Sequence, residues 1–293
     1  MSIHALIPFL LVLACAGIAW FLPRFVEPSV GVVILTVFVM LATLATGMLL
    51  VQIGGAGISE VPFVADAIGW CRALSWGDHG APPILGAAAV LTLGFVLTRV
   101  GRYARKVFQN RRDLGAVDGI EILASNDPIA FAVPGRRGGV VISDSLLSLL
   151  RRDEQRVVVA HENAHLRHRH HLYIHLVGAC AAGLPFLQPF SNRVNYLTER
   201  WADEVAAERI GSREFVADTI ARVALLPSSQ VRSAPLSIGG GNVVNRFEAL
   251  VSPLPAPTTG LTVFACSVVT AAVLGLTLQL HHLIDFITHA GHL

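Results

Sequence analysis

The sequence predicts an α-helical membrane protein with about four transmembrane helices and a separate α+β domain. Of the 293 residues, 53% are hydrophobic and only 14% are charged, whereas soluble domains carry about 25% charged residues. The mean hydropathy of +0.61 points the same way. Long uncharged runs lie towards both ends of the chain and charges return in the middle, which predicts a globular unit there.

Each uncharged run has the length of a membrane span, because a helix needs about 20 apolar residues to cross a bilayer. The predicted spans cover about residues 5–22, 30–53, 81–98 and 261–280. A cleaved signal peptide is the alternative for the first run, but such a peptide has basic residues before its apolar core. Met1–His4 contain none, so we predict a retained span. The chain then divides into an N-terminal membrane region (1–112), a globular domain (113–257) and a last span with a short tail (258–293).

A basic cluster follows the third predicted span, where six of the 22 Lys and Arg residues lie between Arg99 and Arg112. Nucleic-acid binding is one interpretation. The position directly after an apolar run favours a flank on the cytoplasmic side instead, because positive charge stays in the cytoplasm. We therefore predict a multi-pass membrane protein with no nucleic-acid partner. The globular domain is expected in the cytoplasm and both termini outside. The lipid bilayer is expected to surround the spans. An oligomer is compatible with the sequence but not indicated by it.

The globular domain opens with short strands separated by turn residues. The predicted strands are Ile120–Leu123, Ala130–Val133 and Val140–Ile142. Further on, Leu172–Phe190 is apolar over a length sufficient for a span. Pro185 and Pro189 would break a helix in its second half. We therefore predict a helix that is buried against the domain, or that dips into the membrane and returns.

An H-E-x-x-H motif at His161, Glu162 and His165 lies on a predicted helix. Residues four apart share one helical face, so both imidazoles can point at one metal ion. Glu162 can take a proton from an attacking water. Downstream, Glu199 and Asp203 are also four apart: Glu199 can be the third ligand, and Asp203 can accept a hydrogen bond from the outer nitrogen of a ligand histidine. An exposed acidic helix face is the alternative, but the upstream motif favours a metal site.

This combination resembles the membrane-bound gluzincin metallopeptidases, in which H-E-x-x-H is followed by E-x-x-A-D, here Glu199–Asp203. The resemblance covers about Asn126 to Leu250 and is closest to the peptidase part of BlaR/MecR-type regulators, which have three spans before the domain and one after it. HtpX-like and CAAX-prenyl proteases are also similar. The beta-lactam sensors carry a penicillin-binding domain after the last span, whereas this chain ends 13 residues past Leu280. Direct sensing of beta-lactams is therefore not expected.

The resemblance implies a zincin-like domain that hydrolyses peptide bonds. His161, His165 and Glu199 would hold one Zn²⁺ per chain, with Glu162 as general base. Arg246 corresponds to an arginine near the active site of HtpX-like enzymes, which implies a catalytic role in stabilising the oxyanion. A salt bridge to an acidic neighbour is the alternative for Arg246.

Gly139 to Ile142 are predicted to form an edge strand beside the active site. In zinc peptidases with a strand there, an extended substrate adds to the sheet. Gly139, Val140 and Val141 are therefore candidate substrate-binding residues.

Four further histidines lie close to this motif in the sequence. They could be extra metal ligands, or they could be side chains that face solvent or the membrane interface. They are His168, His170, His171 and His175. The related families often have an acidic residue near the position of His170, and the sequence offers no reason for this departure.

Two classes of function remain open. The first is an integral-membrane zinc-dependent endopeptidase that cuts a cytoplasmic or membrane-proximal protein, such as a transcriptional repressor. The second is a non-catalytic membrane sensor or scaffold with a structural zinc site. The intact Glu162 favours the enzyme, because a structural site requires no general base. A transporter is disfavoured, because the predicted spans contain no charged residue to line a path.

Overall fold

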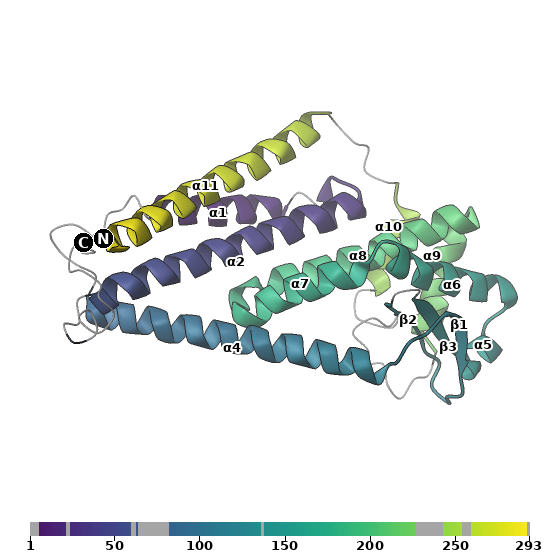
Figure 1. Ribbon diagram of the computed structural model, residues 1–293. Coiled ribbons are helices and arrows are strands. Elements are labelled where there is room, and N and C mark those ends of the chain that lie inside the picture. Colours follow the sequence, from purple (N-terminus) through teal and green to yellow (C-terminus); the bar gives the residue numbers. More distant parts are fainter. Residues whose placement is uncertain are drawn as a thin grey trace.

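The computed structural model describes residues 6–21, 24–59, 63, 82–135, 138–226, 243–253 and 259–291. Its elements in chain order are α1 (Leu6–Ala19), α2 (Pro28–Ser59), α4 (Pro83–Asp113), β1 (Gly119–Leu123), β2 (Ala130–Val133), β3 (Gly139–Ser143), α5 (Asp144–Leu149), α6 (Arg152–Arg167), α7 (His170–Gly183), the 3-10 turn η4 (Pro185–Leu187), α8 (Gln188–Ile210), α9 (Arg213–Ala224), α10 (Val243–Val251) and α11 (Thr259–Gly291). The long helices α1, α2, α4 and α11 extend to one end of the molecule, and the sheet lies at the other (Figure 1).

Two of these helices are long and apolar enough to cross a membrane, over Pro28–Gly57 in α2 and Pro83–Asp113 in α4. Shorter apolar stretches occupy Phe9–Ala19 in α1 and Cys266–His281 in α11. Helix length and composition thus support two of the four predicted spans, and the other two stay predictions. The basic residues that follow the third predicted span continue α4 as one helix rather than starting a loop.

The two long apolar helices differ in what covers them. In the most apolar window, 44% of α2 but only 11% of α4 is buried inside the molecule. α2 contacts α1, α4, α7, α8 and α11, so it forms the centre of the helical part. Where α2 ends and α4 begins, a Cβ atom on Gly57 would collide with the backbone of Gly86, so only glycine permits this close crossing.

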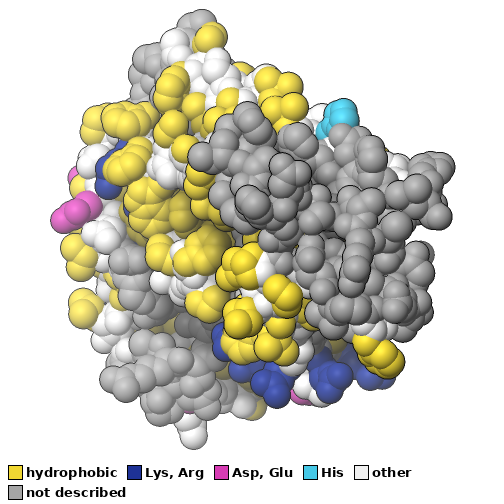
Figure 2. Space-filling model, turned by 90° about the vertical axis from the view of Figure 1, so that its left-hand side faces the viewer, with side chains coloured by type: hydrophobic (Ala, Val, Ile, Leu, Met, Phe, Trp, Pro, Cys, Tyr) yellow, Lys and Arg dark blue, Asp and Glu magenta, His cyan; other side chains and the backbone are white. Residues whose placement is uncertain are grey.

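Apolar side chains dominate the described surface at the end of the molecule to which α1, α2, α4 and α11 extend, as the view along these helices shows (Figure 2). Ile84 and Leu91 of α4 are examples, with 80% and 74% of their surface exposed. Lys and Arg side chains gather along one edge of the same view. Large exposed apolar patches are unfavourable in water and are typical of protein–protein or membrane interaction sites.

The sheet has three strands in the order β1-β3-β2. β3 pairs in parallel with β1, Ile120 opposite Val140, and antiparallel with β2, where Ala132 lies opposite the same residue. β3 is buried along its whole length, whereas β1 is exposed throughout. The three predicted strands are therefore present, but the prediction that Gly139 to Ile142 form an edge strand is wrong. Both sides of β3 are already paired, so Gly139, Val140 and Val141 cannot pair with an added substrate strand.

The apolar run at Leu172–Phe190 does not cross the molecule in one direction. α7 ends at Gly183, the chain turns through η4, and α8 runs back beside α7 (Figure 1). α7 also packs against α2 and α4, and a large apolar core cluster joins residues of α1, α2, α7, α8 and α11. The run is apolar because it inserts between the long helices, and its return delivers α8 to the globular part. The run therefore does not form one continuous crossing helix, as predicted, and its entry into the membrane stays a prediction.

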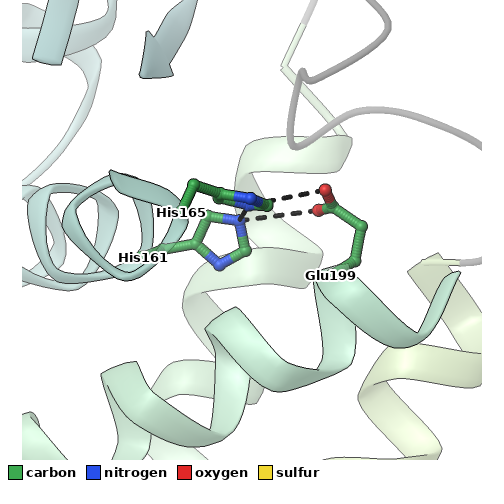
Figure 3. Close-up of side chains that lie close together, drawn as sticks. All are labelled: His161, His165 and Glu199. Atoms are coloured by element: carbon green, nitrogen blue, oxygen red, sulfur yellow. Dashed lines mark hydrogen bonds and ion pairs between the residues drawn. The ribbon is translucent and has the colours of Figure 1, made fainter. Parts of the chain in front are cut away.

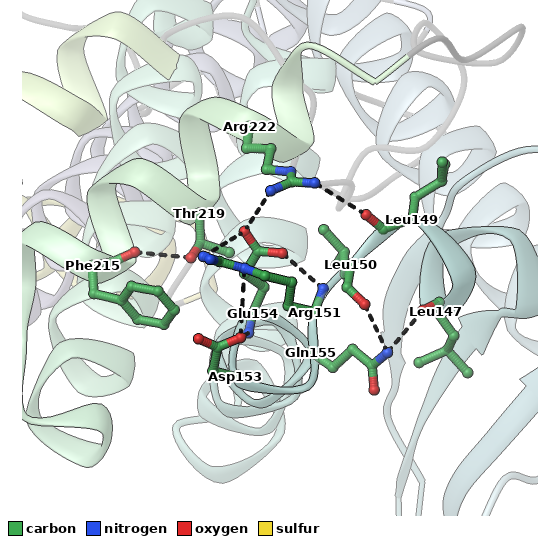
Figure 4. A network of polar contacts seen from close by, with 10 residues as sticks. All are labelled: Leu147, Leu149, Leu150, Arg151, Asp153, Glu154, Gln155, Phe215, Thr219 and Arg222. Atoms are coloured by element: carbon green, nitrogen blue, oxygen red, sulfur yellow. Dashed lines mark hydrogen bonds and ion pairs between the residues drawn. The ribbon is translucent and has the colours of Figure 1, made fainter.

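A buried carboxylate fixes the start of α6 to α9 (Figure 4). Glu154 is 2% exposed and accepts hydrogen bonds from the backbone nitrogen of Arg151 at 2.8 Å and from the guanidinium of Arg222 at 3.1 Å. The first bond closes one half of a capping box, which satisfies a helix N-terminus that would otherwise have free donors. Because Arg222 comes from α9, the same carboxylate also sets the position of α6 in the fold.

Candidate metal centre

The proposed ligands come from two packed helices, α6 and α8 (Figure 3). His161 and His165 lie one turn apart on α6 and are 2% and 5% exposed. Glu199 lies in the middle of α8 and points at both rings, with 19% of its side chain exposed. The structure thus brings together the three residues that the sequence predicts as ligands.

The ligand atoms of the three residues lie within 4.8 Å of one another. The Nε2 atoms of His161 and His165 are 3.1 Å apart. Nε2 of His161 lies 3.5 Å from Oε2 of Glu199, and Nε2 of His165 lies 3.5 Å from Oε1. Tetrahedral zinc with bonds of about 2.0–2.1 Å requires ligand atoms roughly 3.3 Å apart. Two imidazoles and one carboxylate are also a common donor set for catalytic zinc, so these residues fit the ion.

Asp203 and Arg246 support the ligands from behind. An oxygen of Asp203 lies 3.0 Å from Nδ1 of His161, the nitrogen that faces away from the ligand position. The guanidinium of Arg246 donates to both oxygens of Asp203, at 2.8 and 2.6 Å, and its third nitrogen lies 3.1 Å from Glu199. Such contacts orient ligand side chains and fix the tautomer of a ligand histidine.

Arg246 therefore holds two acidic residues of the site, which corresponds to the salt-bridge alternative rather than to a guanidinium free to meet an oxyanion. Arg246 is 2% exposed and lies on α10, which is far from α8 in the sequence. The carboxylates of Glu199 and Asp203 raise its pKa further above the ordinary range, although burial acts in the opposite direction. A catalytic role for Arg246 stays a prediction.

We expect Arg246→Met to lower the free energy of unfolding by about 3–5 kcal/mol, because it leaves Asp203 buried without its cation. Denaturant titration followed by tryptophan fluorescence measures this change. Arg209→Met, at an exposed position of α8, is the matched control and should change little. Equal stability of the two variants would contradict the role assigned to Arg246.

The protonation states in the metal-free site are set by burial and by opposing charges. Burial raises the pKa of Glu162 to about 7, partly offset by His161. Burial would lower the pKa of His161, but hydrogen bonds to Asp203 and Glu199 outweigh it and raise the value to about 10. Burial lowers the pKa of His165 to about 4. Burial would raise the pKa of Glu199, yet Arg246 holds it well below the ordinary range.

Glu162 lies beside the ligands, fully buried, and neither of its carboxylate oxygens accepts a hydrogen bond from a side chain among the described residues. A buried carboxylate without a side-chain donor is costly and marks a group kept for another purpose. The backbone amide of Ala132 faces this carboxylate and opposes the rise of its pKa. β2, at the edge of the sheet, is thus the strand nearest the predicted general base.

Two features of this site were not predicted from the sequence. One is the position of β2 at the edge of the sheet beside Glu162, which depends on strand order. The other is His170, which is completely buried against His165. Burial lowers the pKa of His170 to about 2, so the ring is neutral. His168 packs near it with intermediate exposure, whereas His171 and His175 lie on α7 away from the ligands.

Comparison with known proteins supports a metallopeptidase. The family model described as Peptidase family M48 matches residues 101–188. The match runs from the basic part of α4 to the start of α8 and includes His161, Glu162 and His165 but not Glu199. Searches of curated proteins and of solved structures returned no match. Over the matched residues the chain is similar to the metal-dependent peptidases of family M48.

Proposed function

We propose that the chain is an integral-membrane zinc endopeptidase that cuts a cytoplasmic or membrane-proximal protein. The observation that carries this proposal is the buried carboxylate of Glu162, which accepts from no side chain in the described part of the chain, beside three residues whose ligand atoms lie within 4.8 Å of one another. A structural zinc site would need a fourth protein ligand and no buried base. The family M48 match supports the same class of reaction.

Zinc, when bound by His161, His165 and Glu199, would polarise the scissile carbonyl and make water acidic enough to ionise near neutral pH. The chain's own groups then move the protons. Glu162 takes a proton from the attacking water and delivers it to the leaving amine. Asp203 holds the ring of His161 in place, and Arg246 holds Asp203.

For the substrate we propose pairing with β2 in place of β3. β2 lies at the edge of the sheet, contacts α6, and directs the backbone amide of Ala132 towards Glu162. A substrate in extended form that adds to this edge would place its backbone close to the general base. Recognition through the backbone tolerates many side chains, so it suits an endopeptidase.

We propose that α1, α2, α4 and α11 cross the bacterial plasma membrane and that the peptidase part lies in the cytoplasm. The exposed apolar surface of α4 and its basic C-terminal half support this orientation. α8, which carries Glu199, begins inside the bundle of long helices. A regulatory substrate such as a transcriptional repressor, and a kinship closest to the BlaR/MecR-type regulators, belong to this proposal.

Metal removal tests the proposed function. The full chain, purified in detergent, should contain about one zinc ion, as expected for a mononuclear site, and should cleave casein or itself. Treatment with a chelator should abolish cleavage, and stoichiometric zinc should restore it. Magnesium, which prefers oxygen ligands in octahedral geometry, should not. Bound zinc with no cleavage of any protein would instead indicate the sensor or scaffold.

A further inference from the structure

His170 lies directly against the second proposed zinc ligand. Its Nδ1 atom is 3.0 Å from Nδ1 of His165, with the two rings nearly perpendicular and 4.8 Å apart between centroids. His170 is fully buried, and its other nitrogen has no hydrogen-bond partner among the described residues. The contact with His165 is therefore the polar contact that this buried imidazole makes in the described part of the chain.

The backbone is bent to make this contact. α6 ends at Arg167 and α7 begins at His170, and between them Arg169 has φ of 51° and ψ of 41°. This left-handed conformation is unfavourable for a residue other than glycine. It is the one positive φ outside glycine among the described residues. The turn carries His170 back onto the helix that holds the metal ligands.

The position of one proton decides the direction of the contact. A metal ion on Nε2 of His165 leaves the proton of that ring on Nδ1. Nδ1 of His165 then donates and Nδ1 of His170 accepts, with the second proton of the pair on Nε2 of His170. We propose that His170 is a positioning residue that orients His165 for zinc by accepting this hydrogen bond. The inference rests on the proposed zinc site.

A neutral acceptor suits the charge of the site. With zinc bound, the formal charges of the ion, of Arg246 and of the carboxylates of Glu162, Glu199 and Asp203 cancel. A neutral imidazole at position 170 preserves this balance. A carboxylate there would add a buried negative charge, while the nearby guanidinium of Arg246 already binds Glu199 and Asp203.

Trp201 of α8 packs against the ring of His170. The two rings are 4.7 Å apart between centroids, and Trp201 lies on α8 between Glu199 and Asp203. His168 packs on the same indole, also at 4.7 Å, but contacts neither ligand nitrogen in the described contacts. His168 is therefore a matched control for the effects of packing at this place.

The test uses the full chain in detergent and measures zinc affinity by competition with a chelator. Asparagine places its oxygen where Nδ1 of histidine stands, whereas glutamine reaches the position of Nε2. We expect His170→Gln and His170→Phe to bind zinc about 10–100-fold more weakly, and His170→Asn to remain close to the unchanged chain. His168→Phe should have the affinity of the unchanged chain.

Cobalt provides a second measurement that does not depend on peptidase activity. In the cobalt-loaded chain, the visible absorption bands should shift in His170→Gln and not in His170→Asn, because only the former turns the His165 ligand. Equal zinc affinity and equal cobalt spectra of the Asn and Gln variants would overturn the proposal, even if the Phe variant fails to fold. A chain that binds zinc as expected here but cleaves no protein would contradict the proposed function alone.

Discussion

Glu162→Gln should reduce peptide-bond cleavage by about 10²–10⁴-fold while the chain keeps its zinc, because general-base catalysis contributes an effect of that size. The amide has nearly the shape of the carboxylate but cannot accept the proton of the attacking water. The three ligand atoms are on other residues, so metal content should not change. Initial rates of casein cleavage and zinc measured by atomic emission give the two quantities.

The matched control is Glu214→Gln, which makes the same chemical change at an exposed position of α9. It should leave both the rate and the zinc content unchanged. Full activity of Glu162→Gln would show that Glu162 is not the general base. The buried carboxylate of Glu162 would then have no assigned function. Loss of zinc together with activity would show that Glu162 supports the metal site instead.

Glu199→Gln should remove most of the bound zinc and, with it, essentially all cleavage. An amide oxygen is a weak ligand for zinc, and two histidines alone leave the site short of the three protein ligands of a catalytic centre. Arg246 would also lose one of its two carboxylate partners. Zinc per chain after dialysis against a weak chelator is the direct measurement.

Glu208→Gln is the control for this variant, because Glu208 is exposed on the same helix, further along α8. It should retain zinc and activity. If Glu199→Gln kept a full complement of zinc, a different group would be the third ligand, and the proximity of His161, His165 and Glu199 would reflect packing of α6 against α8 alone.

The local part of the site was predictable because helix geometry is local. Residues four apart lie on one face, so the spacing of His161 and His165, and that of Glu199 and Asp203, already predicted which side chains could converge. The return of the chain between them followed from the same argument, since the ligands on both helices must reach one ion. Pro185 lies where the structure places the turn.

The strand order was not predictable in the same way. The strand predicted at Val140–Ile142 lies within β3, but whether a strand lies at the edge or in the centre depends on what pairs with it. β1 precedes β2 in the chain, but it pairs with the side of β3 that is opposite to β2. No local pattern in the residues of β3 encodes that choice, and it moves the proposed substrate edge to β2.

The sequence by itself determined the chemistry available to this protein: an apolar chain with a charged domain, a helix bearing two histidines and a base, and a second helix bearing two carboxylates. Only the tertiary structure decided how those groups are supported. Arg246 reaches Asp203 across 43 positions of the chain, and His170 reaches His165 through a left-handed residue. The spacing of residues on one helix depends only on residues that are close in the sequence. These contacts, by contrast, form only after distant helices have packed together and excluded water.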